Sequence, residues 1–159
     1  MKKIQYINRD LLSALAEQAI HSERRRLNHN FHQPEDLVNR MLNAIEPDSY
    51  VRPHRHKSPP KEETFIILQG KGAILIFEED GSICEVFPLD PTESKWGVDI
   101  PAGAYHTVVS LVTETIYFEV KAGPYVPITD KDFAPWAPPE KTAEAMDYLK
   151  QLRIKASPA

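Results

Sequence analysis

The chain has little cysteine, no long apolar run and no excess of positive charge. Cys84 is the single cysteine among 159 residues, so an internal disulfide cannot form, which favours the reducing cytoplasm. The apolar patch near the N-terminus is interrupted at residues 8–10, and no segment approaches the ~20 apolar residues that span a bilayer. We therefore expect a cytoplasmic protein with neither a signal peptide nor a membrane partner.

The charge balance also disfavours a nucleic-acid partner. The chain has 19 Lys and Arg against 23 Asp and Glu, a formal net charge of -4. Nucleic acids are bound by basic surfaces that neutralise phosphates, and the sequence contains no helix-turn-helix segment. We expect a small-molecule ligand and no nucleic-acid partner.

Proline content and short β-branched runs predict a mostly β fold. The 14 prolines exceed the average usage of about 5%, and proline is tolerated at turns and strand edges but not inside helices. Strands are predicted at 27–32, 64–68, 73–77, 83–87, 98–100, 105–111 and 115–120. Many short strands bounded by glycine and proline are typical of a sandwich or barrel.

Short helices are expected near both ends of the chain. Residues 10–20 have apolar side chains at helical spacing, after a cap at Asn8 or Asp10. The apolar side of a second helix, near the C-terminus, is expected to contain Ala145, Met146, Leu149 and Leu152. Residues 34–45 stay open between a first helical turn and a strand that begins at about residue 40.

Three histidines and one glutamate form a candidate metal site. His54 and His56 project from the same face of an expected strand, roughly 6.6 Å apart at the backbone, so both imidazoles can bind one ion at about 2.0–2.1 Å. Glu63 opens the next strand, and His106 would come from a third. Taken singly, a histidine pair in a basic loop is often solvated surface, and a lone histidine is often a core residue. Together the four suit one divalent ion, which can be Fe, Mn, Ni, Zn or Cu.

The spacing of these residues resembles the paired motif of the cupins. The first half runs His-x-His, Glu, six residues and Gly, and it is matched by His54, His56, Glu63 and Gly70. The second half runs Gly and then Pro-x-Gly-x-x-His, and it is matched by Gly97, Pro101, Gly103 and His106. The resemblance implies a single all-β cupin domain, a double-stranded β-helix or jelly-roll barrel with short N- and C-terminal helices.

The match departs from the cupin pattern at three points. Asp48 replaces the leading glycine, and Ser110 replaces an asparagine that usually follows the last histidine. The gap from His56 to Glu63 is longer than usual, which makes Glu62 an alternative ligand. A one-residue shift on a strand reverses the face of the side chain, and Glu63 is preferred because it keeps the spacing to Gly70.

Longer segments resemble the WbuC-type cupin metalloproteins. The likeness lies in residues 24–28, 41–56, 118–125 and 133–138 and extends over about residues 5–140. Members of that family occur with genes for bacterial surface polysaccharide such as O-antigen. The resemblance implies a role in the metabolism of sugars or sugar nucleotides, and it implies no particular reaction.

The whole chain, residues 1–159, is expected to be one domain. Its parts are an N-terminal helix and strand extension at 1–33, the cupin barrel at 34–125, and a Pro-rich tail with a helix at 126–159.

Successive side chains of a strand point to opposite faces, which predicts the residues that lie near the ion. Tyr50 and Arg52 are predicted to share the face of the histidine pair, where the Arg52 guanidinium suits an anionic substrate group. A structural ion pair is the alternative for Arg52. The polar face of the first strand is either a further substrate-binding surface or a solvated edge, and it contains Arg26, Asn28, Asn30 and His32.

The strand at 115–120 offers acid and base candidates. Tyr117 and Glu119 lie on its polar face. They can move protons if that face lines the cavity, and they are ordinary surface residues if it faces solvent.

Three functional hypotheses follow from these residues. The first is an enzyme that isomerises or epimerises a small polar carbohydrate or sugar nucleotide, in which the metal polarises an oxygen and Glu119 or Tyr117 moves a proton. The second is an Fe(II)-dependent oxygenase. The third is a non-catalytic sugar-binding or regulatory cupin, because the fold hosts many functions. Sheet edges that need cover further predict a homodimer.

Overall fold

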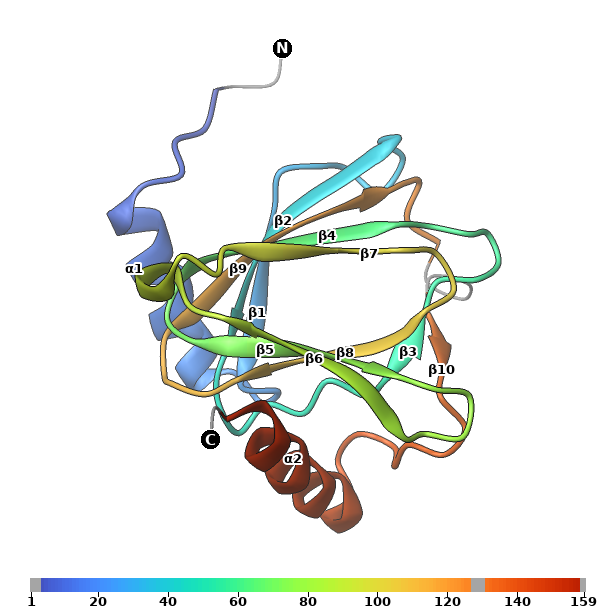
Figure 1. Cartoon of the computed structure of the whole chain (residues 1–159). Coiled ribbons are helices and arrows are strands. Elements are labelled where there is room, and N and C mark those ends of the chain that lie inside the picture. Colours follow the sequence, from blue (N-terminus) through green and yellow to red (C-terminus); the bar gives the residue numbers. More distant parts are fainter. Residues whose placement is uncertain (1–3, 127–130, 158–159) are drawn as a thin grey trace.

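The computed structural model describes residues 4–126 and 131–157, which form two facing antiparallel sheets (Figure 1). In spatial order the first sheet contains β1 (Arg26–Asn30), β2 (Val38–Ile45), β9 (Thr115–Ala122), β4 (Glu63–Gln69) and β7 (Gly97–Ile100). The second sheet contains β10 (Asp132–Phe133), β3 (His54–Arg55), β8 (Tyr105–Ser110), β5 (Gly72–Phe77) and β6 (Ile83–Leu89). Strands far apart in sequence are neighbours in both sheets, and the predicted all-β cupin jelly-roll fold is confirmed.

Helix α1 (Arg9–His21) covers the outer face of the first sheet. It begins after Asn8, whose side chain accepts a hydrogen bond from the Leu11 amide at 3.1 Å, as predicted for an N-cap. Its apolar stripe packs on outward side chains of β2 and β9, and the buried members of this cluster are Leu15, Ala16, Ala19, Leu42, Ala44 and Ile116. Burial of this face stabilises the helix, because a helix of this length is marginal by itself in water.

Helix α2 (Ala143–Ala156) covers the outer face of the second sheet. Its buried residues are Ala145, Leu149, Leu152 and Ala156, which pack against β5 and β8. The prediction that Met146 belongs to this stripe is wrong, because its side chain is 42% exposed. The buried residues are four, three and four positions apart, so they lie along one side of the helix. Met146 directly follows Ala145 and therefore lies about 100° from that side around the helix axis.

The inward-facing side chains of β4 and β9 are polar at one end of the strand and apolar at the other. On β4 the inward residues run from Glu63 through Phe65 to Ile67, all buried. On β9 they run from Glu119 to Tyr117, which belongs with Phe65 and Ile67 to the apolar core between the sheets. One end of the interior is therefore an ordinary hydrophobic core, and the other end gathers titratable groups.

Two segments that were ambiguous in the sequence contribute strands. Residues 34–35 form a turn and the following chain pairs with β1 as strand β2, so the strand alternative for the 34–45 segment is the correct one. The Pro-rich tail contributes β10, which pairs with β3 and which the sequence did not predict. Part of that tail, residues 127–130, lies outside the described residues. Neither α1 nor α2 is long and apolar enough to cross a bilayer.

Truncation of the α2 stripe should destabilise the protein. Leu149 is 2% exposed, so Leu149→Ala should lower the free energy of unfolding by about 2–5 kcal/mol through lost burial and the resulting cavity. Met146→Ala on the same helix is the matched control and should cost less than about 1 kcal/mol. Urea denaturation followed by circular dichroism measures both, and equal losses would contradict this packing.

Candidate metal centre

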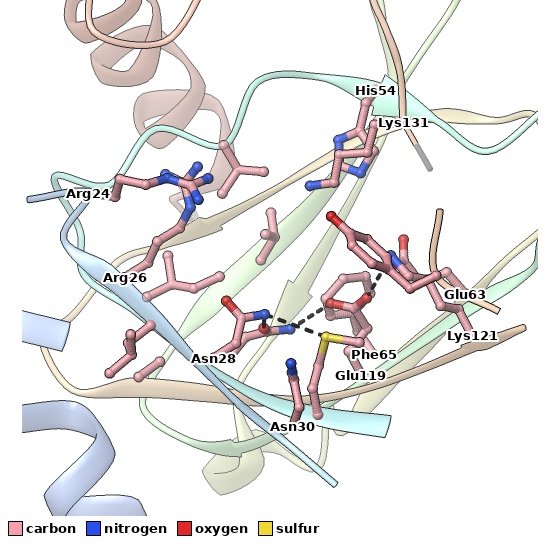
Figure 2. A pocket seen from close by; sticks show the side chains of 18 of the residues that line it. Arg24, Arg26, Asn28, Asn30, His54, Glu63, Phe65, Glu119, Lys121 and Lys131 are labelled. Atoms are coloured by element: carbon pink, nitrogen blue, oxygen red, sulfur yellow. Dashed lines mark hydrogen bonds and ion pairs between the residues drawn. The ribbon is translucent and has the colours of Figure 1, made fainter. Parts of the chain in front are cut away.

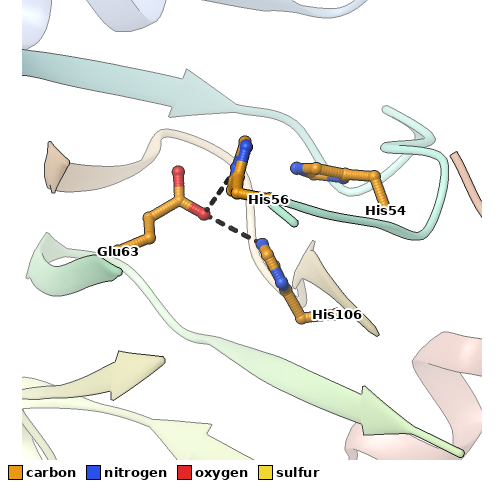
Figure 3. Close-up of side chains that lie close together, drawn as sticks. All are labelled: His54, His56, Glu63 and His106. Atoms are coloured by element: carbon orange, nitrogen blue, oxygen red, sulfur yellow. Dashed lines mark hydrogen bonds and ion pairs between the residues drawn. The ribbon is translucent and has the colours of Figure 1, made fainter. Parts of the chain in front are cut away.

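The four predicted ligands come from both sheets and meet between them (Figure 3). His54 lies on β3 directly opposite His106 on β8, Glu63 opens β4 in the other sheet, and His56 follows β3. Their ligand atoms all lie within 4.8 Å of one another. The four residues are between 2% and 5% exposed. Side chains separated by up to 52 positions in sequence therefore form one buried cluster.

A turn between β7 and β8 holds two of the histidines in place. Gly103 has φ of +84°, a conformation that favours glycine, and its amide donates to the His56 carbonyl at 3.1 Å. The carbonyl of Ala104 accepts from His106 Nδ1 at 3.0 Å. The Pro-x-Gly-x-x-His half of the motif thus supplies one ligand and fixes the backbone of another.

Hydrogen bonds set the tautomers of two imidazoles. His54 Nδ1 lies 3.0 Å from the Arg52 carbonyl, and His106 Nδ1 lies 3.0 Å from the Ala104 carbonyl. A carbonyl only accepts, so both Nδ1 atoms carry a proton, and in the neutral imidazole each Nε2 then has the lone pair that can bind a metal ion. This second hydrogen bond is how metal-binding histidines are oriented. Burial lowers the pKa of His54 well below its usual value, and the positive charge of Lys131 adds to the effect.

The Glu63 carboxylate faces the imidazoles with a single oxygen. Its Oε2 lies 2.9 Å from His106 Nε2 and 3.4 Å from His56 Nε2. Burial by itself would raise the pKa of Glu63, but its bonds with His106 and His56 outweigh burial and lower the pKa well below its usual value. An ionised oxygen facing an imidazole lone pair requires a positive charge, which a proton or a bound cation supplies.

These distances test whether the residues fit a metal ion. Two ligands bound at about 2.1 Å lie roughly 3.0 Å apart at a right angle and roughly 3.4 Å apart at a tetrahedral angle. The observed separations of 2.9 Å and 3.4 Å from Glu63 Oε2 match these values. Three imidazoles and one carboxylate are a donor set for a divalent transition-metal ion. The buried cluster can therefore hold one.

The structure also decides between the two adjacent glutamates. Glu62 is exposed, whereas Glu63 is buried in the cluster. The inserted residues 57–62 fold back on themselves through a bridge between Lys57 and Pro60. Strand pairing then starts at Glu63, opposite Ile100 on β7 and Lys121 on β9. The long gap is accommodated before the strand begins, so the face of Glu63 is preserved.

A cavity of about 460 Å³ opens beside the cluster (Figure 2), within the usual range for small-molecule sites. His54, Glu63 and His106 lie in its wall. The opposite wall is the inner face of β1 and the residues next to it, and it includes all four of the predicted polar residues, Arg26, Asn28, Asn30 and His32. Their roles in substrate binding stay predictions.

A chain of polar contacts links β1 to the ligands. Asn28 Nδ2 donates to Asn43 Oδ1 at 2.7 Å, and Asn43 Nδ2 donates to Glu119 Oε2 at 2.6 Å. Lys121 Nζ then lies 3.3 Å from Glu119 Oε1 and 3.5 Å from Glu63 Oε1. Burial and the nearby Glu63 carboxylate raise the pKa of Glu119 to about 8. The cavity therefore contains an acid that can hold a proton near neutral pH, next to the candidate metal ligands.

Three predicted site residues lie elsewhere. The Tyr50 hydroxyl donates to the Pro138 carbonyl under α2, and Arg52 donates to the Ala134 carbonyl with its guanidinium over the Phe133 ring. The chain before His54 is irregular, so alternation does not extend back to these two residues. The Tyr117 side chain points inward as predicted, but its hydroxyl donates to the Val109 carbonyl inside the apolar core. None of the three lines the cavity.

Several cavity residues escaped the sequence analysis. Lys121 follows Glu119 by two positions on β9 and therefore points to the same face of the sheet. Extending the predicted strand beyond residue 120 would have identified it. Asn43 lies in the segment left open between helix and strand. Arg24 and Lys131 lie outside any predicted strand, so strand alternation does not identify them as cavity residues, although Arg24 belongs to the 24–28 segment that resembles the WbuC-type cupins.

Solved structures with a similar fold include proteins of different length. CapF in complex with the inhibitor 3-isopropenyl-tropolone shares 23% identity over 70% of this chain and 32% of its own, with a TM-score of 0.56. The capsular polysaccharide assembling protein CapF from Staphylococcus aureus gives 22% identity over the same shares, with a TM-score of 0.51. The protein TT1209 from Thermus thermophilus gives 19% identity over 77% of this chain and 97% of its own, with a TM-score of 0.53.

These similarities show the fold alone, and the chain spans about a third of the length of the CapF chains. The comparison with curated proteins gives no match. The sequence model of one family, described as a domain of unknown function, matches residues 7–89, just over half of the chain. The chain belongs to this family, DUF6016.

Proposed function

We propose that the protein is a metal-dependent enzyme that isomerises or epimerises a small polar carbohydrate or sugar nucleotide. The observation that carries the proposal is the position of Glu119, a buried carboxylic acid in the cavity whose wall includes His54, Glu63 and His106 of the candidate metal cluster. A polar cavity with a titratable group favours proton transfer, whereas a purely sugar-binding cupin would need no such acid.

The four clustered residues would hold one divalent ion. Fe, Mn, Ni, Zn and Cu all suit three imidazoles and a carboxylate. When bound, such an ion supplies Lewis acidity to a carbonyl or hydroxyl oxygen of the substrate.

Glu119 would move the proton in this reaction. Asn43 donates to its Oε2 at 2.6 Å, so Oε2 is fixed and Oε1 is the oxygen that accepts and returns a proton. Lys121 lies 3.3 Å from Oε1 and balances the negative charge when the proton has left. Burial raises the pKa of Glu119 above its usual value, which brings proton uptake and release closer to neutral pH and suits a general acid and base.

Two similarities support a role in bacterial surface polysaccharide metabolism. The segments quoted above resemble the WbuC-type cupins, which occur with O-antigen genes, and CapF is described as assembling capsular polysaccharide. The single cysteine supports a cytoplasmic site for this chemistry.

We also propose that the protein is a homodimer. β1 forms an edge of the first sheet in the described part of the chain. Ile4 and Tyr6 flank Gln5, whose side chain lies 3.2 Å from that of His29 on β1, and Leu37 directly precedes β2; these three apolar residues are 98%, 81% and 78% exposed. Unpaired strand edges and apolar surface are commonly covered by association.

Glu63→Gln should abolish stoichiometric metal binding. The substitution removes the only carboxylate of the cluster within the described residues, and elemental analysis by mass spectrometry should find about one ion per chain in the wild type and far less in the variant. Glu62→Gln is the matched control, because it makes the same change one position away on an exposed side chain. Equal metal content in the two variants would contradict the ligand assignment.

Glu119→Gln should stop proton transfer and leave the metal in place. In deuterated water, magnetic resonance of candidate sugar nucleotides should show deuterium entering the wild-type product, and the exchange rate should fall by about 10²–10⁴-fold in the variant. Glu85→Gln, on the exposed face of β6, should exchange at the wild-type rate. Exchange that persists in Glu119→Gln would overturn its role, and oxygen consumption dependent on iron would indicate an oxygenase instead.

The dimer is tested by size-exclusion chromatography with light scattering. We expect twice the mass of the 18.1 kDa chain. Leu37→Lys should shift the protein toward monomer, because it places a charge in the proposed contact. A wild-type protein that elutes as a stable monomer over a range of concentrations would contradict the proposal.

A further inference from the structure

The wall of the cavity is positively charged although the protein as a whole is negative. Four cationic side chains line it, Arg24, Arg26, Lys121 and Lys131, against the two carboxylates Glu63 and Glu119 among the described lining residues. The formal net charge of the chain is -4. A cavity whose charge opposes that of its protein concentrates ligands of negative charge.

Two of these cations already have protein partners. Lys121 lies between Glu63 and Glu119, at 3.5 Å and 3.3 Å from their oxygens. Arg26 pairs with Glu140 at 2.7 Å and donates to the Tyr50 carbonyl at 2.8 Å. These two side chains are held in place by the protein itself and leave little positive charge for a ligand.

Arg24 and Lys131 are differently placed. Arg24 has one contact with Glu140 at 3.5 Å, which Glu140 shares with Arg26, and its side chain is half exposed. Lys131 is partly buried and makes no ion pair with a carboxylate of residues 4–126 or 131–157. Burial lowers the pKa of Lys131, and the like charge of Lys121 adds to this. The Glu119 and Glu63 carboxylates act in the opposite direction without forming an ion pair with Lys131, so an anionic ligand in direct contact would supply counter-charge to this partly buried ammonium.

The position of Lys131 places this charge beside the metal cluster. Its charge acts directly on His54, and Figure 2 shows Lys131 beside His54, with Arg24 and Arg26 across the cavity. The amide side chains of Asn28 and Asn30 lie on the wall between these two ends. Amides of this kind hydrogen-bond hydroxyl groups.

We propose that the cavity binds a sugar that carries an oxyanion, with the anion held by Lys131 next to the metal cluster and attracted by Arg24. The oxyanion is the carboxylate of a sugar acid or the phosphate of a sugar phosphate. This inference rests on the proposed function in that it takes the ligand to be a carbohydrate, and it adds the chemical group that distinguishes this carbohydrate from a neutral one. The two sources share the recognition chemistry, a charge-assisted hydrogen bond to an anionic oxygen.

Isothermal titration calorimetry of the purified 159-residue chain tests the proposal with three probes, glucuronate, glucose 1-phosphate and glucose. At least one anion should bind about tenfold or more tightly than glucose, as expected for one charge-assisted hydrogen bond, and the tighter anion identifies the source. Lys131→Met should abolish this preference and Lys131→Arg should keep most of it. Lys150→Met, which removes an equal charge on an exposed helix position, should change nothing.

Three outcomes would overturn the proposal. These are binding of glucose as tight as that of both anions, binding of neither anion, and equal affinities in Lys131→Met and Lys150→Met. The titrations are repeated in Glu119→Gln, which retains the cavity but lacks the proton-transfer group. Lys131-dependent anion binding without any deuterium exchange in the wild type would leave this inference standing and remove the proposed reaction.

Discussion

The buried carboxylate of Glu63 is the charge around which the cavity is arranged. Isolated ionised carboxylates are not tolerated in a protein interior, because removing one from water costs several kcal/mol. Here His106, His56 and Lys121 all face it, at 2.9 Å, 3.4 Å and 3.5 Å. Removing Glu63 would leave the converging imidazoles without an anionic partner and Lys121 with Glu119 as its carboxylate contact. A divalent ion in this cluster would supply positive charge and accept the imidazole lone pairs at the same time.

The same constraint explains how the fold divides its interior. Along β4 and β8 the inward side chains change from charged or ligating to apolar, and along the antiparallel strand β9 they change in the opposite order. The apolar half, together with α1 and α2 on the outer faces, provides the burial that stabilises the sheets. The polar half of the interior therefore does not have to stabilise the fold, and the sheets hold its side chains in position. The Asn43, Glu119 and Lys121 side chains contact one another from the neighbouring strands β2 and β9, which hold them in place.

Much of this arrangement could be predicted from residue types and spacing. The His-x-His pair, the Pro-x-Gly-x-x-His turn and the choice of Glu63 follow from period two and motif spacing, because strand alternation is local. The predicted positions of Tyr50 and Arg52 were wrong because the chain before His54 is not a strand. The predicted position of Tyr117 was wrong because strand alternation shows which face of the sheet a side chain is on, but not whether it lies in the cavity or in the apolar core. Lys131 and Arg24 could not be found, since only the tertiary fold brings these parts of the chain to the cavity.

X-ray absorption spectroscopy at the edge of the bound metal tests the central claim most directly. The account predicts a first shell of nitrogen and oxygen at about 2.0–2.2 Å and the outer-shell scattering typical of several imidazole rings, reduced in His106→Ala. A shell of oxygen atoms alone, without imidazole scattering, would show that the ion binds elsewhere and would contradict the account.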